Sequence, residues 1–135
     1  MNKIRPYRGI RIDGGGWAYG SAVENQSGRA FIIEDMWMEI NTFTGKPDYV
    51  FAWVEVFPET VGQMTGGHDK NKRDIFEGDI VIVGQDREQS VVTYEAAAFY
   101  TSISKGNYRL SGWKTRSVEV TGTVHDHLLK GEVDG

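Results

Sequence analysis

Three short clusters of acidic and histidine side chains could do chemistry in this sequence. The first, His125-Asp126-His127, places two imidazoles around a carboxylate. Residues i and i+2 of a strand share a face, so both imidazoles could reach one metal ion. Apart from His68, no third or fourth ligand follows from the spacing. The sequence therefore favours surface histidines at a strand end, and we expect no metal.

The second cluster is the carboxylate pair Glu77 and Asp79, which flanks Gly78. Paired carboxylates serve glycoside hydrolysis or divalent-metal binding, which would make this a small metal-dependent hydrolase. The alternative is structural, with Asp79 accepting hydrogen bonds from turn amides and Glu77 paired with a nearby base. We favour the structural interpretation.

The third cluster, Asp69 to Asp74, begins like an EF-hand loop. Such a loop needs Gly at its sixth position and a bidentate Glu at its twelfth, where this chain has Asp74 and Ile80. A solvated turn is the better prediction. The glycines at 14–16 lack the spacing of a phosphate cradle, and no nucleophile elbow is present. We therefore expect no catalytic residue and no cofactor, and interpret the protein as a non-enzyme.

Composition describes one domain with an uneven charge. The chain has 135 residues, 17 Gly, no Cys and a net charge of −4. Residues 1–32 hold five basic and two acidic residues, whereas residues 34–60 hold six acidic residues and one basic residue. This polarity favours packing between the two ends, or between neighbouring subunits of a homo-oligomer. The alternative is a nucleic-acid contact through basic residues near the start: Lys3, Arg5, Arg8 and Arg11.

The sequence carries no sign of a membrane or export segment. Its first ten residues hold three basic residues and no apolar run. No stretch approaches the 18 apolar residues of a membrane-spanning helix. We expect a cytoplasmic protein that makes no membrane contact.

Apolar residues recur mostly with the period of two that is typical of strands. The patterns predict strands at 17–23, 78–84, 91–94, 107–113 and 117–125, with 78–84 and 91–94 paired as a hairpin. Turn clusters rich in Gly, Asn and Asp separate the strands. Helix is predicted only as single turns, at 95–100 and before Leu129.

These elements predict a mostly β fold with little helix. We expect a hairpin-rich sheet from 4 to 56 and an SH3-like, partly closed barrel from about 70 to 125. The chain is taken as one domain, 1–135, with possible lobes 1–57 and 58–130 and a frayed tail at 131–135. The positions expected to be buried are Trp17, Tyr19, Phe31, Trp53, Val56, Ile80, Ile82, Val92, Val120 and Val124.

One apolar cluster permits two interpretations. Met36-Trp37-Met38 is most simply part of the core. It could also lie in a subunit interface, because Met and aromatic residues are enriched there.

Four segments together resemble the YopX-like family of phage and prophage proteins. Residues 8–20 resemble its RGKR-D-G-WVYG signature, and 58–66 its PETVGQYTG signature. Residues 69–81 resemble DKNGKEIFEGDIV, and 118–126 resemble VEVIGNIYEN. The motif residues carried by this resemblance, with no assigned role, are Trp17, Tyr19, Gly20, Thr60, Gly62, Gln63, Thr65, Gly66, Asp69, Glu77, Gly78, Asp79 and Gly122.

The resemblance implies a small β-rich protein encoded in phages and prophages, in a family without an established activity. It therefore implies no catalytic residues. The first hypothesis is an accessory protein that binds itself and an unknown phage or host protein. A nucleic-acid-binding module and a small metal-dependent hydrolase are the alternatives.

Overall fold

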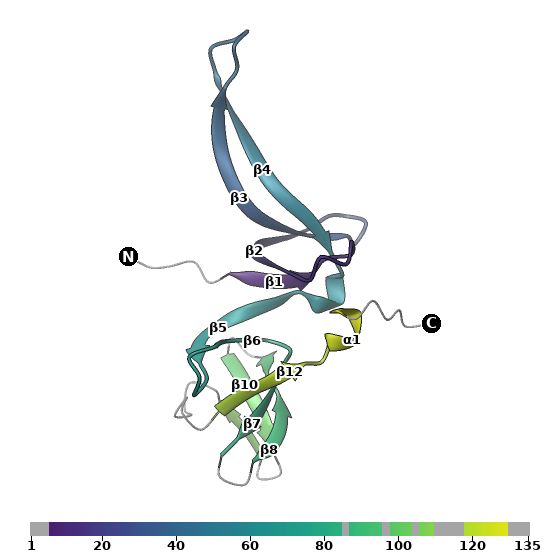
Figure 1. Cartoon of the computed structure of the whole chain (residues 1–135), viewed down its shortest axis with the longest axis vertical. Coiled ribbons are helices and arrows are strands. Elements are labelled where there is room, and N and C mark those ends of the chain that lie inside the picture. The colour runs from purple at the N-terminus through teal and green to yellow at the C-terminus, as the bar shows by residue number, and fades with distance from the viewer. Residues whose placement is uncertain (1–5, 85–86, 96–97, 104–105, 110–117, 130–135) are drawn as a thin grey trace. The chain divides into compact units, whose positions relative to one another are not determined.

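The computed structural model describes residues 6–84, 87–95, 98–103, 106–109 and 118–129. The chain forms two compact units, Pro6–Val61 and the described residues from Gly62 onward (Figure 1). Strands dominate both units. Helical structure in the described residues comprises the 3-10 turn η1 (Pro58–Thr60) and the four-residue α1 (Asp126–Leu129). The predicted mostly β fold with little helix is confirmed, and so is the helical turn that ends at Leu129.

The N-terminal unit contains an antiparallel sheet with the strand order β4-β3-β2-β1. Glycines with positive φ at the turns allow the chain to reverse, as at Gly14 and Gly16, with φ of 85° and 88°. One face of the sheet buries the small apolar core of Ala18, Ala30, Ile32 and Val56. The strand bounds are β1 (Tyr7–Ile10), β2 (Trp17–Glu24), β3 (Ala30–Ile40) and β4 (Pro47–Val56).

Strands β3 and β4 continue beyond β2 as a two-stranded ribbon (Figure 1). The pairing of β2 with β3 starts at Ser21 and Ile33, and the residues of β3 after Ile33 pair only with β4 among the described strands. The β3–β4 register shifts between Ile33 and Asp35, which leaves Glu34 as an extra residue in a β-bulge. We call the ribbon beyond this bulge, residues 35–52, the arm.

The C-terminal unit contains a β5–β6 hairpin and two three-stranded sheets, with the orders β12-β7-β8 and β11-β10-β9. Its core consists of Ile75, Val81, Val83, Val92, Val118 and Val120. The sheets of the described residues do not close into a barrel, so the SH3-like barrel is not confirmed. The bounds are β5 (Gly62–His68), β6 (Asp74–Phe76), β7 (Asp79–Val83), β8 (Glu88–Val91), β9 (Thr93–Glu95), β10 (Ala98–Ile103), β11 (Gly106–Arg109) and β12 (Val118–Thr123).

Two element predictions in this unit are corrected. The partner of β7 is Glu88–Val91 and not 91–94, because Thr93–Glu95 pairs with β10 in another sheet. The helical turn predicted over 95–100 is wrong, since Glu95 ends β9 and residues 98–100 begin β10. The strand predicted over 107–113 is described only within Gly106–Arg109, and its remainder lies outside the described residues, as does the tail at 131–135.

Of the ten positions expected to be buried, three are buried, four are half-buried and three are exposed. Val56, Val92 and Val120 are buried as expected, and Trp17, Phe31, Ile80 and Ile82 are half-buried. The exposed side chains Tyr19, Trp53 and Val124 contradict the prediction.

Each of these three errors has a local cause. Ala18 precedes Tyr19, and Val54 follows Trp53; both of these small residues face the core. Because side chains alternate along a strand, the rings of Tyr19 and Trp53 face the opposite side of the sheet. In β12 the register shifts between Val120 and Gly122. This bulge turns Thr123 inward in place of Val124.

Candidate functional site

The register of the arm sorts its side chains onto two chemically different faces. Residues directly opposite each other in an antiparallel pair lie on the same face. One face therefore holds the pairs Met36–Phe51, Met38–Tyr49 and Ile40–Pro47. The other holds Asp35–Ala52, Trp37–Val50 and Glu39–Asp48. All residues of the arm are described, and among them every carboxylate in these six pairs lies on the second face.

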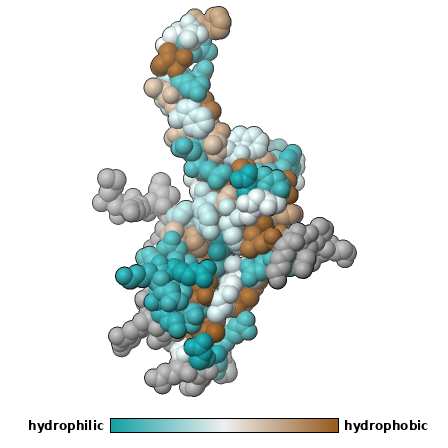
Figure 2. Space-filling view, viewed as in Figure 1, coloured by the Kyte–Doolittle hydropathy of each residue, from teal (hydrophilic) through white to brown (hydrophobic). Residues whose placement is uncertain are grey.

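The apolar face is open to solvent along its length. Its five large side chains, which we call the arm stripe, are 46 to 64% exposed: Met36, Met38, Ile40, Tyr49 and Phe51. Figure 2 shows brown and pale residues interspersed with teal ones along the arm. An isolated two-stranded hairpin is marginally stable in water, and monomeric proteins rarely expose apolar patches of more than a few hundred Å². The arm stripe thus has the properties of a binding surface.

A hollow at the base of the arm continues this apolar face. It has a volume of about 400 Å³ and is lined by Val23, Asn25, Phe31, Ile33, Phe51 and Trp53. Phe31 and Trp53 meet edge to face, with ring centroids 5.0 Å apart. Because Glu34 is the bulged residue, odd-numbered β3 residues line this base pocket and even-numbered residues continue the same face along the arm.

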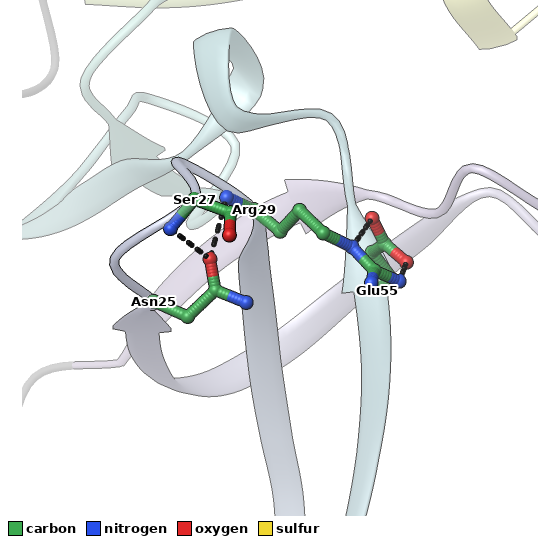
Figure 3. A network of polar contacts seen from close by, with 4 residues as sticks. All are labelled: Asn25, Ser27, Arg29 and Glu55. Carbon is green, nitrogen blue, oxygen red and sulfur yellow. Dashed lines mark hydrogen bonds and ion pairs between the residues drawn. The ribbon is translucent and has the colours of Figure 1, made fainter.

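Polar contacts fix the chain beside the base pocket (Figure 3). The Asn25 side-chain oxygen accepts hydrogen bonds from the backbone amides of Ser27 and Arg29, each at 3.0 Å. The Arg29 guanidinium then forms a two-pronged ion pair with Glu55 on β4, with Nε 3.0 Å from Oε2. This network ties the β2–β3 turn to β4, so the pocket wall is preorganised.

The turn at the far end of the arm presents one fully exposed aromatic ring. The Asn41 side-chain oxygen accepts hydrogen bonds from the amides of Phe43 and Thr44, at 2.9 and 3.1 Å. Gly45 adopts a positive φ of 69° and donates its amide to the Asn41 carbonyl at 2.8 Å. Phe43 is held in this turn with 97% of its surface exposed.

The Met36-Trp37-Met38 cluster is not core, because all three side chains are 42 to 57% exposed. The core interpretation is therefore wrong, and the interface interpretation stays a prediction. Sequence reasoning missed Phe43, Tyr49 and Phe51 as functional candidates. Their period-two spacing around Pro47 was a usable signal, but it also fits a buried strand.

The carboxylate of Asp69 organises the EF-hand-like loop by accepting hydrogen bonds from backbone amides. Asp69 is 3% exposed, and its Oδ1 accepts hydrogen bonds from the amides of Asn71 and Arg73 at 2.8 and 2.9 Å. Its Oδ2 accepts from the amide of Val120, 51 residues away, at 2.9 Å. Desolvation raises the pKa of Asp69, but these backbone hydrogen bonds outweigh it and hold the pKa below its ordinary value.

Within the Glu77–Asp79 pair, the carboxylate of Asp79 is buried and binds a backbone amide. Asp79 is 1% exposed, and its Oδ2 accepts a hydrogen bond from the amide of Phe76 at 2.8 Å. Gly78 supplies a positive φ of 90° between the two carboxylates. This geometry matches the predicted interaction of Asp79 with turn amides.

The histidine cluster does not form a strand face. Strand β12 ends at Thr123, so His125 lies in a turn and His127 in α1. Asp126 between them accepts hydrogen bonds from the amide and the hydroxyl of Thr123, at 3.0 and 2.9 Å. Within the described part of the chain, no three His, Cys, Asp or Glu side chains gather as a metal site.

The basic residues near the start are arranged for packing. Arg8 is 6% exposed, and its guanidinium carbon lies 4.1 Å from the ring centroid of Trp17. Arg11 pairs with Asp13, with Nη2 2.8 Å from Oδ2. Lys3 and Arg5 lie outside the described residues. This placement does not favour Arg8 or Arg11 as a phosphate contact, so the nucleic-acid alternative gains no support here.

Several motif residues hold the backbone in place. The Thr60 hydroxyl accepts the amide of Ile10 at 2.8 Å and donates to the Phe57 carbonyl at 2.6 Å. A Cβ on Gly62 would lie 2.5 Å from the Glu77 carbonyl oxygen, so only glycine fits there. These contacts give Thr60 and Gly62 structural roles.

No helix among the described residues has the length and apolarity needed to span a membrane. No curated protein matches the chain. The structure is similar to protein EF1440 from Enterococcus faecalis, with a TM-score of 0.64 and 20% identity, covering 95% of this chain and 99% of that one. Protein yopX from Bacillus subtilis matches with a TM-score of 0.48 and 20% identity, covering 93% and 95%. The family model of the YopX protein matches residues 17–129. The chain therefore belongs to the YopX family.

Proposed function

We propose that this protein is a non-enzymatic phage or prophage accessory protein that acts by binding protein through its arm. It does so as a homo-oligomer in the cytoplasm of its bacterial host. A further phage or host protein is a second partner. The observation that carries the proposal is the arm stripe, a charge-free apolar face open to solvent.

The chemistry of the arm supports a protein partner over nucleic acid. Exposed Met and aromatic side chains are typical of protein interfaces, and the carboxylates of the opposite face would repel phosphates. The buried carboxylates support the non-enzymatic part of the proposal, because Asp69 and Asp79 are both engaged by backbone amides.

A charge placed in the arm stripe is expected to abolish binding. Met38→Glu puts a carboxylate at the centre of the apolar face, where association would bury it without a partner charge. Sedimentation velocity should show an oligomer for the wild type and a monomer for Met38→Glu. Both proteins should give the same circular dichroism spectrum, because Met38 is 54% exposed and its replacement leaves the core of the unit unchanged.

The matched control is Glu39→Lys, which changes the next residue on the opposite face. It should sediment like the wild type. A wild type that stays monomeric at every concentration and binds no host or phage protein would refute the proposed function. Equal effects of the two variants would show that the apolar face is not the binding surface.

A further inference from the structure

We propose that the partner of the arm stripe is the same stripe of a second copy. The two arms lie antiparallel across a two-fold axis, and Phe43 at each tip fills the base pocket of the other copy. This inference rests on the proposed function and names its partner and its geometry.

The charge distribution of the arm favours a second copy of the chain as the partner of the arm stripe. The arm is described in full, and none of the carboxylates in its six cross-strand pairs lies on the apolar face. The surface that covers this face should therefore be uncharged and apolar. Another arm stripe has that chemistry. When two such faces stack, Asp35, Glu39 and Asp48 of each copy point to solvent. A two-fold interface uses the same patch on both subunits, as this arrangement requires.

The available area matches what a stable dimer needs. The exposed apolar side chains of the stripe, tip and pocket rim are Val23, Met36, Met38, Ile40, Phe43, Tyr49, Phe51 and Trp53. At roughly 100 Å² for each half-exposed large side chain, they supply on the order of 800 Å² per copy, the size of a standard interface.

The spacing along the arm places the two-fold axis at the Met38–Tyr49 pair. The base pocket surrounds the Ile33–Trp53 pair, four residues from Tyr49 along β4. At a rise of about 3.3 Å per residue this distance is about 13 Å. In the other direction, two residues lead from Tyr49 to Pro47, and the six-residue turn 41–46 that follows the Ile40–Pro47 pair carries Phe43 at the tip. An axis midway between pocket and tip therefore brings each tip over the opposite pocket.

The tip and the pocket are suited to each other as knob and hole. Phe43 is 97% exposed in a turn that is held by Asn41. Because the turn is already ordered, its backbone loses little conformational entropy on binding. The pocket volume of about 400 Å³ is ample for one ring, since a cavity of about 150 Å³ holds benzene. Phe31 and Trp53 offer aromatic edges and faces to an incoming ring.

Phe43→Ala should weaken the dimer without changing the fold of the monomer. Each dimer loses two buried rings, so its dissociation constant in sedimentation equilibrium should rise on the order of 100-fold. Thr42→Ala, in the same turn, is the control and should change it by less than about threefold. Val23→Glu, on the pocket rim, should reproduce the loss. The double variant Phe43→Ala/Val23→Glu should be little weaker than either single variant, because both remove one contact.

A Phe43→Ala variant that dimerises like the wild type would overturn the clasp. If Met38→Glu still abolished association in that case, the proposed function would stand with a different pairing of the arms. Additive losses in the double variant would also overturn it, because Phe43 and the pocket would then act separately. A wild type that is monomeric at all concentrations would reject both the clasp and self-association.

Discussion

Replacing Gly20 by alanine is expected to unfold the N-terminal unit, or to lower its free energy of unfolding by about 4 kcal/mol or more. A Cβ at this position would lie 2.0 Å from the carbonyl oxygen of Ile33 and 2.9 Å from its carbonyl carbon. The obstacle is backbone, which cannot rotate aside as a flexible side chain can. The strand ladders fix both partners, since Tyr7 pairs with Gly20 and Ser21 with Ile33. Thermal unfolding followed by circular dichroism measures the loss.

Gly14→Ala separates this clash from the general cost of losing a glycine. Gly14 has a positive φ of 85°, but a Cβ there meets nothing within 4 Å. Its replacement should cost only about 1 kcal/mol. Equal losses for the two variants would show that the close approach at the root of the arm is unimportant for stability.

Asp69→Ala is expected to destabilise the C-terminal unit by about 3 to 5 kcal/mol. The substitution removes the acceptor of three backbone amides, one of which belongs to the buried Val120 of β12. An amide left without a partner in the interior costs more than the hydrogen bond itself contributed. Chemical denaturation measures the change. Asp74→Ala is the control in the same hairpin, because it removes only an exposed ion pair with His68 and should cost less than about 1 kcal/mol.

The lowered pKa of Asp69 also predicts how stability responds to acid. Because the folded pKa lies below the unfolded value of about 4, the carboxylate contributes its full stabilisation above that pH. The contribution is lost as the pH falls through the folded pKa. Asp69→Asn should therefore flatten the acid limb of the stability profile, and an unchanged limb would contradict the role of this carboxylate.

The sequence predicted those parts of the structure that depend on local chemistry. Period-two spacing indicated the strands, glycines marked the turns, and Asp79 was correctly weighed as a residue that binds turn amides. The short helix before Leu129 was also predictable. Each of these features depends on residues within a few positions of one another.

The β-bulges at Glu34 and Thr121 could not be predicted because no residue type marks a bulge. Glu34 and Thr121 each add one residue to a strand, and each insertion reverses which side chains face inward. The exposure of the arm was equally invisible. Alternating apolar residues give the same sequence pattern whether the apolar face of the strand is buried by the same chain or exposed to solvent. Burial depends on segments that are distant in the sequence.

Crosslinking of single cysteines tests most directly whether the apolar face of the arm meets a second copy. The chain contains no Cys, so each introduced thiol is unique. Stacked sheets lie about 10 Å apart, which suits a short bismaleimide. We predict that Met38→Cys, at the proposed two-fold axis, forms a covalent dimer, whereas Glu39→Cys, on the opposite face, stays largely monomeric. Equal crosslinking of the two variants, or crosslinking of Glu39→Cys alone, would contradict the assignment of the arm stripe as the binding face.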